Sequence, residues 1–390
     1  MDDSEIFSIT NDAPLEDGDI GALVPREVIK VIGVGGAGGN ALNTIIRSGI
    51  DDVDFIAGNT DVAALRLSEA SSKLILGRNL TKGRGAGANP SVGQEAAQES
   101  EEEISQLLEG ADMVFITAGM GGGTGTGAAP VIAGIAKEKV GALVVAIVTY
   151  PFSWEGPRRI QQATEGIGRL REKVDALVIV HNDRIIELSD KSTTWQEAFK
   201  MSDEVLRQAV AGVTGVIRKI MQVNVDFADV CTIMRNAGTA IMGVGEAKGD
   251  GRVLAAARAA MNGPLMTAPM NGASSVLYCI ESGEDLSILE MNEAAKLISA
   301  SAREDANIIW GQGIDPSMGD TVRFTLIATG FKDVLADKND AKARAGADSA
   351  GLFEKQNLTP SDVVSEEPHS IFEGLGSGLD IPTTYRRRKK

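Results

Sequence analysis

The sequence has few cysteines and histidines, and this scarcity excludes several common kinds of site. Its 390 residues include two cysteines, Cys231 and Cys279, and two histidines, His181 and His369. The cysteines are far apart and form no CxxC pair, so we expect reduced thiols rather than a disulfide framework. The isolated histidines give neither a zinc cluster nor a Ser-His-Asp arrangement, and we predict no metal ligands from the protein.

The sequence also lacks the segments that take a protein into or across a membrane. It contains no run of about 18 apolar residues, so we expect no membrane span. The first residues, MDDSEIFSIT, have neither a basic start nor an apolar stretch, so we expect no secretory signal. Together these absences predict a cytoplasmic protein.

Positive charge is scarce as well. The chain has 38 lysines and arginines against 54 acidic residues, a formal net charge of −16. General binding to nucleic acid or to an anionic membrane requires a basic face, so we predict no general nucleic-acid binding. The local exception is the end of the chain, residues 386–390, which reads RRRKK.

Strands and helices alternate along the first half of the chain. Helical stretches such as 91–109 and 158–174 separate the later strands. Buried apolar strands that alternate with helices indicate a parallel sheet covered on both faces. We therefore predict an α/β fold with a Rossmann-like sheet. Apolar runs predict its strands at 28–35, 53–58, 73–77, 112–119, 143–151 and 176–183.

A second, smaller α/β domain follows a long helix at about 204–222. Its predicted strands lie at 239–247, 274–282 and 321–331, and its helices near 251–262 and 289–301. The two ends of the chain are too poor in apolar residues to fold alone. The predicted organisation is a disordered leader (1–25), a first domain (26–203), a central helix (204–223), a second domain (224–332), a disordered linker (333–378) and an end peptide (379–390).

Two glycine clusters each follow a predicted strand and precede a predicted helix. The first reads GVGGAGGN at 33–40 and satisfies the pattern GxGxxG; the second reads GGGTGTG at 121–127. Each turn brings backbone N–H groups and the positive end of a helix dipole close to an anion. Two such turns indicate a polyphosphate held from two sides, with the threonine hydroxyls as additional donors.

An NAD-dependent dehydrogenase is the rival interpretation of the first cluster. Its fingerprint requires an acid at the carboxyl end of the second strand to hold the ribose. Here Asp54 lies at the start of that strand, and the far end reads GNTD. No GxxxxGK[ST] motif is present, so no P-loop lysine is offered to the phosphates, and the backbone, the helix dipoles and Mg²⁺ must balance their charge.

Asp226 and Asp229 are the candidates for the chemistry, because neither glycine cluster contains a general base. They lie three residues apart, just after the long helix, and share one helical edge if FADVCTIM is a helix. The same spacing suits an N-cap residue and the acid of a capping box. The local pattern alone favours capping over catalysis.

With these motifs the chain resembles the tubulin superfamily and, within it, the FtsZ family of bacterial cell-division GTPases. The motifs are GVGGAGGN, NTD at 59–61, GGGTGTG and NVDFADV at 224–230, and the resemblance runs from about residue 26 to 332. It implies the tubulin fold, GTP and GDP as ligands, and Mg²⁺ bound mainly through the phosphates. It also implies head-to-tail filaments that form the cytokinetic ring, in the cytoplasm near the inner face of the membrane.

The resemblance assigns side chains to each part of the nucleotide. In PFSWEGPRR it places Glu155 on the ribose and Arg159 near the phosphates and ribose; each alone would suit an exposed ion pair. It places Asn182 and Asp203 on the guanine, where each alone would suit capping, and it stacks Phe199 on the base. The implied phosphate loops are Gly36, Ala37, Gly38, Gly39 and Asn40, and Gly122, Gly123, Thr124, Gly125 and Thr126.

A site divided between subunits is also implied. The loop with Asp226 and Asp229 reaches the nucleotide of the next subunit and polarises the attacking water, with Asn224 as a polar neighbour. A head-to-tail contact is heterologous and can propagate as an open filament. The end peptide 379–390 resembles the family's binding peptide for membrane-anchoring and regulatory division proteins. A tubulin-like filament protein with another cargo remains the alternative.

Overall fold

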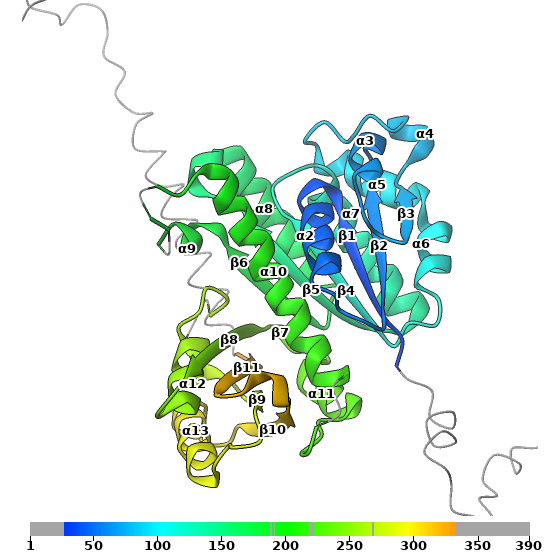
Figure 1. The fold of residues 1–390 in the computed structure, drawn as a ribbon. Helices are drawn as coiled ribbons and strands as arrows, with labels where there is room; N and C mark the ends of the chain where they lie inside the picture. The colour runs from blue at the N-terminus through cyan, green and yellow to red at the C-terminus, as the bar shows by residue number, and fades with distance from the viewer. Residues whose placement is uncertain (1–26, 188, 191, 219–220, 267–268, 332–390) are drawn as a thin grey trace, which may run out of the picture. The chain divides into compact units, whose positions relative to one another are not determined.

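The computed structural model describes residues 27–331, apart from positions 188, 191, 219–220 and 267–268 (Figure 1). The predicted leader, the predicted linker 333–378 and the predicted end peptide 379–390 lie outside the described residues.

A seven-stranded parallel sheet forms the first part of the described chain, with the order β3-β2-β1-β4-β5-β6-β7. The six predicted strands are present. The seventh, β7, comes from beyond the long helix and was not predicted, because it has only two residues. The strands are β1 (Ile29–Val34), β2 (Val53–Asn59), β3 (Ser72–Ile75), β4 (Met113–Gly119), β5 (Leu143–Tyr150), β6 (Ala176–His181) and β7 (Gly238–Thr239).

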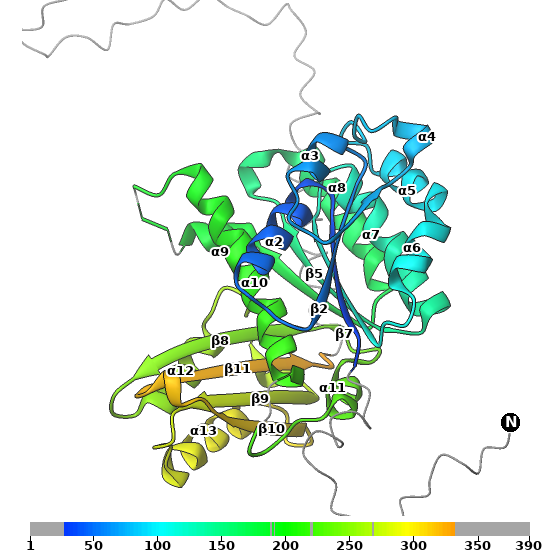
Figure 2. The same cartoon turned by 45° about the vertical axis from the view of Figure 1, so that its right-hand side comes forward.

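Helices cover both faces of this sheet (Figure 2). Phe115 of β4 belongs to a core shared with α2 (Gly35–Arg47) and α10 (Trp195–Arg218), whereas the adjacent Ile116 belongs to a core shared with α7 (Thr124–Gly134) and α8 (Pro157–Arg171). Adjacent strand residues point to opposite faces, so both faces are buried, as the continuous apolar runs predict. The remaining helical elements here are α3 (Val62–Arg66), α4 (Arg78–Thr81), α5 (Pro90–Glu99), α6 (Glu101–Leu108), η1 (Ile135–Val140), η2 (Ser153–Glu155) and α9 (Asn182–Glu187).

The predicted helix at 91–109 is two helices, α5 and α6, that meet at Ser100. The Ser100 hydroxyl is turned toward the end of β3, where it accepts a hydrogen bond from the Gly77 N–H at 3.0 Å. A buried serine that bonds to a neighbouring element competes with the helix backbone, which accounts for the break.

The long helix α10 begins at Trp195, nine residues before the predicted start at 204. Its first turn is fixed by a capping box: the Thr194 N–H donates to Glu197 Oε2 at 2.7 Å, and the Glu197 N–H donates to Thr194 Oγ1 at 3.3 Å. The prediction was wrong at this end because residues 195–201 show no buried apolar face. At the other end the helix is described as far as Arg218, and residues 221–226 are not helical. In the ranges that the structure describes, no helix has the combination of length and apolar character that crossing a membrane requires.

A second sheet of four strands has the order β10-β9-β11-β8 and is mixed. β9 and β10 are parallel, and β11 runs antiparallel to both β9 and β8. Three of these strands were predicted; β10 was not. The elements are α11 (Phe227–Met234), β8 (Ile241–Lys248), α12 (Arg252–Met261), η3 (Met270–Gly272), β9 (Ser275–Ser282), α13 (Ile288–Ser301), β10 (Asn307–Ile314), η4 (Pro316–Met318) and β11 (Thr321–Thr329).

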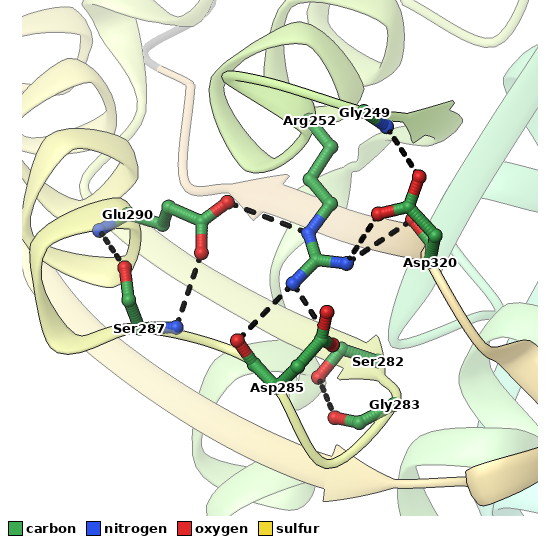
Figure 3. A network of polar contacts seen from close by, with 8 residues as sticks. All are labelled: Gly249, Arg252, Ser282, Gly283, Asp285, Ser287, Glu290 and Asp320. Carbon is green, nitrogen blue, oxygen red and sulfur yellow. Dashed lines mark hydrogen bonds and ion pairs between the residues drawn. The ribbon is translucent and has the colours of Figure 1, made fainter.

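Arg252 forms ion pairs that connect the loops at one end of the second sheet (Figure 3). This arginine is 4% exposed and forms ion pairs with Asp285 at 2.9 Å, Asp320 at 2.8 Å and Glu290 at 3.4 Å. The three carboxylates come from the loop after β9, the residue before β11 and the first turn of α13. Because a buried charge is stable only when paired, the cluster holds these segments in fixed positions.

Candidate functional site

The two glycine clusters lie together at the carboxyl edge of the first sheet. α2 begins at Gly35 directly after β1, and α7 begins at Thr124 shortly after β4, the neighbouring strand. A Cβ atom on Gly35 would lie 2.9 Å from the backbone N of Gly125, and Gly35 has a φ of +75°. The helix starts are therefore in contact. Within the described residues no side chain caps either start, so the first N–H groups remain available to an anion.

Three of the predicted phosphate-loop glycines border open space. A Cβ atom on Gly36, Gly39 or Gly122 would meet no atom within 4 Å. Asn40, in the second turn of α2, is exposed beside them. These positions leave room for a ligand to approach the backbone.

The other predicted loop residues pack against neighbouring backbone. A Cβ on Gly38 would lie 2.4 Å from the Thr117 carbonyl oxygen, and one on Gly125 would lie 2.7 Å from the carbonyl oxygen of Gly119. Ala37 fills the space beside Gly119, whose own Cβ would lie 2.5 Å from that of Ala37. Glycine is needed at these positions because it lets two helix starts and two strand ends lie in contact.

The two threonines of the second cluster have different environments. Thr124 Oγ1 lies 2.6 Å from Thr60 Oγ1, so the loop that contains NTD is joined to the start of α7. Thr126 is fully buried, and its hydroxyl accepts a hydrogen bond from the Gly121 N–H at 2.8 Å. Thr126 thus stabilises the loop from within, and Thr124 is the hydroxyl at the helix start.

A third glycine-rich loop, residues 83–90 (GRGAGANP), joins this edge and was missed by the sequence analysis. Its Gly85 N–H donates to the Thr60 carbonyl at 3.0 Å, and a Cβ on Gly123 would lie 2.9 Å from that of Ala86. Several of its residues, Gly83 and Gly85 among them, have positive φ, a geometry that forms anion-binding backbone concavities. The exposed Arg84 adds a cation. The repeated glycines were the available signal.

The predicted ribose segment contacts the second glycine cluster. Arg159 Nη1 pairs with Glu155 Oε2 at 3.0 Å, so the ion pair expected from their spacing is present. Glu155 also accepts from the Phe152 N–H at 2.8 Å. A Cβ on Gly121 would lie 2.7 Å from Arg159 Cγ, so the arginine packs over the loop that leads into α7. This contact brings Arg159 to the edge where the two glycine clusters meet.

Phe199 stands at the centre of an aromatic group that continues from this segment. Its ring lies 5.3 Å from that of Phe152, 6.2 Å from that of Trp154 and 6.3 Å from that of Trp195, each time edge to face. Trp154 and Trp195 are 61% and 67% exposed. The predicted base-stacking ring is therefore adjacent to the predicted ribose segment.

The predicted guanine-reading residues are Asn182 and Asp203. They lie close together because Ser202, the residue before Asp203, is hydrogen-bonded to Asn182. The Ser202 hydroxyl donates to Asn182 Oδ1 at 2.8 Å, and both residues are buried. Burial raises the pKa of Asp203 from its ordinary value of 3.8 to about 7, and no neighbour within the described residues offsets this effect. A partly buried carboxylate to which no described residue donates a hydrogen bond is suited to accept hydrogen bonds from a ligand.

The predicted catalytic residues lie at the other end of α10. The loop before α11 pairs with β10, as the Gln312 N–H donates to the Val223 carbonyl at 3.1 Å. Asn224 is exposed, and its Oδ1 accepts from the Met221 N–H at 3.4 Å. Asp226 caps α11: its Oδ1 accepts from the Asp229 N–H at 2.7 Å, and Asp229 Oδ2 accepts from the Asp226 N–H at 3.4 Å.

The predicted capping box is therefore confirmed, and it leaves room for a second role. The two capping bonds use one oxygen of Asp226 and one oxygen of Asp229, so each carboxylate keeps an oxygen that takes no part in capping. Asp226 is also exposed. From Asp203 to Arg218 the helix α10 spans roughly 22 Å at 1.5 Å per residue. The predicted guanine-reading residue and the predicted catalytic carboxylates are thus far apart within one chain.

The protein side chains do not gather around a metal in the part of the chain that the structure describes: no group of three or more histidine, cysteine or acidic residues there could hold an ion.

Two family models match the chain, and the first defines its class. Residues 28–190 match the model described as Tubulin/FtsZ family, GTPase domain, and residues 238–332 match FtsZ family, C-terminal domain. The glycine-rich helix starts fall on the GTPase model, and Asp203, the predicted guanine-reading carboxylate, lies beyond its end. The first match places this part of the chain among the tubulin-type GTPases.

Solved structures narrow this class. An empty FtsZ dimer of M. jannaschii is 42% identical, covers 81% of this chain and 93% of its own, and has a TM-score of 0.75. A mutant of the same protein is 43% identical, covers 78% and 92%, and has a TM-score of 0.73. The chain belongs to the FtsZ family, as its motifs indicated. A GTPγS-bound protofilament of CetZ2 from Haloferax volcanii, 21% identical over 83% of this chain and 99% of its own, shares the fold with a TM-score of 0.73.

Proposed function

We propose that this chain binds GTP and GDP and hydrolyses GTP at the contact between successive copies in a head-to-tail filament. One observation carries the proposal: the nucleotide edge and the carboxylates of α11 lie at opposite ends of α10. A copy stacked on the first would bring its Asp226 and Asp229 to the nucleotide that the first copy holds. The FtsZ dimer among the similar structures supports self-association.

In this proposal the carboxyl edge of the first sheet holds the nucleotide. The start of α2, at Gly35 and Gly36, and the start of α7, at Thr124, supply N–H groups and helix dipoles to the phosphates. Glu155 accepts from the ribose hydroxyls, and Arg159 lies between ribose and phosphates. The remaining residues of the two loops that surround the phosphates are Ala37, Gly38, Gly39, Asn40, Gly122, Gly123, Gly125 and Thr126. Mg²⁺, held mainly by phosphate oxygens, would help to balance their charge.

The guanine is read by a donor and an acceptor. Asn182 presents its amide to the base, Asp203 accepts from N1–H and the exocyclic amine, and Phe199 stacks on the ring. Adenine has an acceptor where guanine has N1–H, so the Asp203 carboxylate would be left unpaired. Such a mismatch predicts discrimination of roughly two to four orders of magnitude against ATP.

Hydrolysis itself needs a positioned water. Asp226 and Asp229 of the stacked copy orient and polarise that water, and Asn224 is their polar neighbour. Phosphoryl transfer depends chiefly on positioning and electrostatic stabilisation, so supplying these groups from a second copy makes hydrolysis dependent on assembly.

The biological role that we propose is septation: filaments of this chain organise the cytokinetic ring at the division site, in the cytoplasm. The match to the FtsZ C-terminal model favours this role over a tubulin-like filament with another cargo. Residues 379–390 would bind membrane-anchoring and regulatory division proteins. The apolar Leu379, Ile381 and Tyr385 would form the anchor, and the basic RRRKK end would add salt-sensitive attraction to an acidic partner or membrane.

The experiment that tests the proposal measures GTP hydrolysis against protein concentration. The specific activity should be near zero at low concentration and rise above a critical concentration at which sedimentable polymer appears. NAD binding, measured in parallel, should be absent. A dilute monomer that turns over GTP at the rate of the concentrated protein would contradict the divided site.

A further inference from the structure

We propose that a polar cluster of Lys137, Asp175 and Asn236, called here the Lys137 cluster, positions α11 so that its carboxylates meet the nucleotide of the next copy. The cluster lies at the amino edge of the first sheet, behind α11, and none of its members touches the nucleotide edge. The inference rests on the proposed function, because it concerns residues that act through Asp226 and Asp229.

Asp175 is the centre of the cluster. It precedes β6, is 3% exposed, and forms four hydrogen bonds to two segments. Its Oδ2 accepts from the Val144 N–H at 2.9 Å, and its Oδ1 accepts from the Asn236 N–H at 3.3 Å. Its main-chain N–H donates to the Val144 carbonyl at 2.8 Å, and its carbonyl accepts from the Gly238 N–H at 3.0 Å. One aspartate thereby joins the start of β5 to the segment that follows α11.

Lys137 completes the cluster. Its Nζ lies 2.9 Å from Asp175 Oδ1, donates to Asn236 Oδ1 at 3.1 Å and donates to the Val174 carbonyl at 3.3 Å. All three donor positions of the ammonium group are used, in a fixed geometry. Asn236 has a φ of +53°, a left-handed conformation that asparagine tolerates better than most residues. The turn after α11 is thus fixed by both its backbone and its side chain.

The position of α11 depends on such anchors, because the helix has only eight residues. A helix of that length is not stable alone. Its first end follows the loop paired to Gln312 of β10, and near its last end the Ile233 carbonyl accepts from the Thr329 hydroxyl at 2.9 Å. The Lys137 cluster ties the last end to the first sheet, beside the pairing of β7 with β6 and the buried apolar side chains of α11. Loosening it would let the helix turn, and Asp226 and Asp229 would turn with it.

The cluster is also connected to the nucleotide edge through a single helical rod. Lys137 lies in η1, a π-helical segment that continues α7 without a break, and α7 begins at Thr124 in the second glycine cluster. The 17 residues of α7 and η1 span roughly 25 Å at the usual helical rise. In the proposed function the start of α7 therefore contacts the phosphates of the nucleotide that this chain binds. Lys137, near the other end of the same continuous helix, positions the α11 carboxylates that contact the nucleotide of the next copy.

A matched control exists two residues away. Lys139 lies in the same π-helical segment but pairs with Glu101 at the surface, where both side chains are about half exposed. Lys139→Met removes the same charge from the same segment without touching the Lys137 cluster.

The first experiment compares Lys137→Met, Lys137→Arg, Asn236→Gly and Lys139→Met. Misplacing the carboxylates by about 1 Å predicts that Lys137→Met lowers kcat for GTP hydrolysis in assembled protein by roughly 10- to 100-fold. The affinity of the dilute monomer for GTP should not change. Lys137→Arg should recover part of the activity. Asn236→Gly, which keeps the left-handed turn and the Lys137–Asp175 pair, should lose less than Lys137→Met, and Lys139→Met should match the wild type.

The second experiment asks which face of the subunit carries the defect. Lys137→Met is mixed with Asp203→Ala, a variant whose loop and α11 are intact but whose base reading is lost. If the Lys137 cluster acts through α11, the Asp203→Ala subunits supply correctly placed carboxylates to the nucleotides bound by Lys137→Met subunits. The GTP hydrolysis rate per Lys137→Met subunit should then rise in the mixture. A defect that the mixture does not relieve, a loss of GTP affinity in the monomer, or a kcat of Lys137→Met equal to that of Lys139→Met would each overturn the inference. A failure of the proposed function is recognised separately, because the wild type would then show no assembly-dependent hydrolysis.

Discussion

Asp203 offers a prediction whose size follows directly from the structure. Its pKa rises from 3.8 to about 7 because burial disfavours the charged form. A rise of this size corresponds to about 4 kcal/mol of free energy. Between these two pH values the folded protein binds more protons than the unfolded chain, so its stability falls as pH rises through this window. Above pH 7 the folded, nucleotide-free protein bears the full cost of the buried charge.

Asp203→Asn removes that charge and nearly preserves the shape of the side chain. We expect it to raise the free energy of unfolding of the nucleotide-free protein by up to about 4 kcal/mol at pH 8, and by about 2 kcal/mol at pH 5. Urea unfolding of both proteins at the two pH values measures the difference. The substitution should at the same time weaken GTP binding, because an amide cannot accept from N1–H and the exocyclic amine together.

The same carboxylate makes GTP affinity depend on pH. In the proposed binding mode guanine donates two hydrogen bonds to Asp203, so the bound form is ionised. The affinity should then fall roughly tenfold for each pH unit below 7. Phosphate groups also titrate near pH 6, so Asp203→Asn serves as the control that shares their titration. If the two proteins show parallel pH profiles for GTP binding, or if Asp203→Asn is no more stable at pH 8, the carboxylate is not the buried acceptor described here.

Four further predictions address other parts of the molecule. Asparagine caps a helix as well as aspartate, so Asp226→Asn should leave the thermal unfolding temperature unchanged while lowering GTP hydrolysis by roughly a hundredfold or more; unchanged hydrolysis would make Asp226 a cap only. Gly122→Ala places a methyl group in open space at the phosphate-facing edge, so stability should hold while GTP affinity, measured by titration, falls about tenfold, or about 1.4 kcal/mol. Arg252→Met should lower the free energy of urea unfolding by about 2 kcal/mol, without a change of hydrolysis in the folded protein. Deletion of 379–390 should preserve hydrolysis and polymerisation but abolish recruitment to the membrane in cells; a truncated protein that still supports division would contradict a docking role.

The first sheet could be predicted because its strands are buried on both faces. Continuous apolar runs such as 112–119 and 143–151 have few alternative interpretations, and the glycines that follow two of them indicate an anion site. β10, an edge strand with the sequence NIIWGQGI, was not predicted, since it has two glycines and half-exposed side chains and so shows no clear period. The start of α10 was misplaced for a related reason, because its first turns contribute little to the core.

The site was predictable in its residue types but not in its arrangement. That the starts of α2 and α7 touch follows from the adjacency of β1 and β4, which the order of strands along the chain does not give. The third glycine loop, 83–90, follows a short helix rather than a strand, so the rule that located the other two missed it. The burial of Asp203 arises from tertiary packing, and the spacing of Asp226 and Asp229 could not separate capping from catalysis. The resemblance to the FtsZ family supplied those roles.

The central claim, that one active site is assembled from two copies, is tested most directly by mixing two inactive variants. Asp203→Ala lacks base reading but keeps its α11 carboxylates, and Asp226→Ala keeps its nucleotide edge but lacks one carboxylate. In an equal mixture that assembles at random, about a quarter of the head-to-tail contacts join an intact nucleotide edge to an intact loop. The account predicts that the mixture recovers GTP hydrolysis to about that fraction of the wild-type rate. A mixture that stays as inactive as its two components, although it forms polymer, would contradict it.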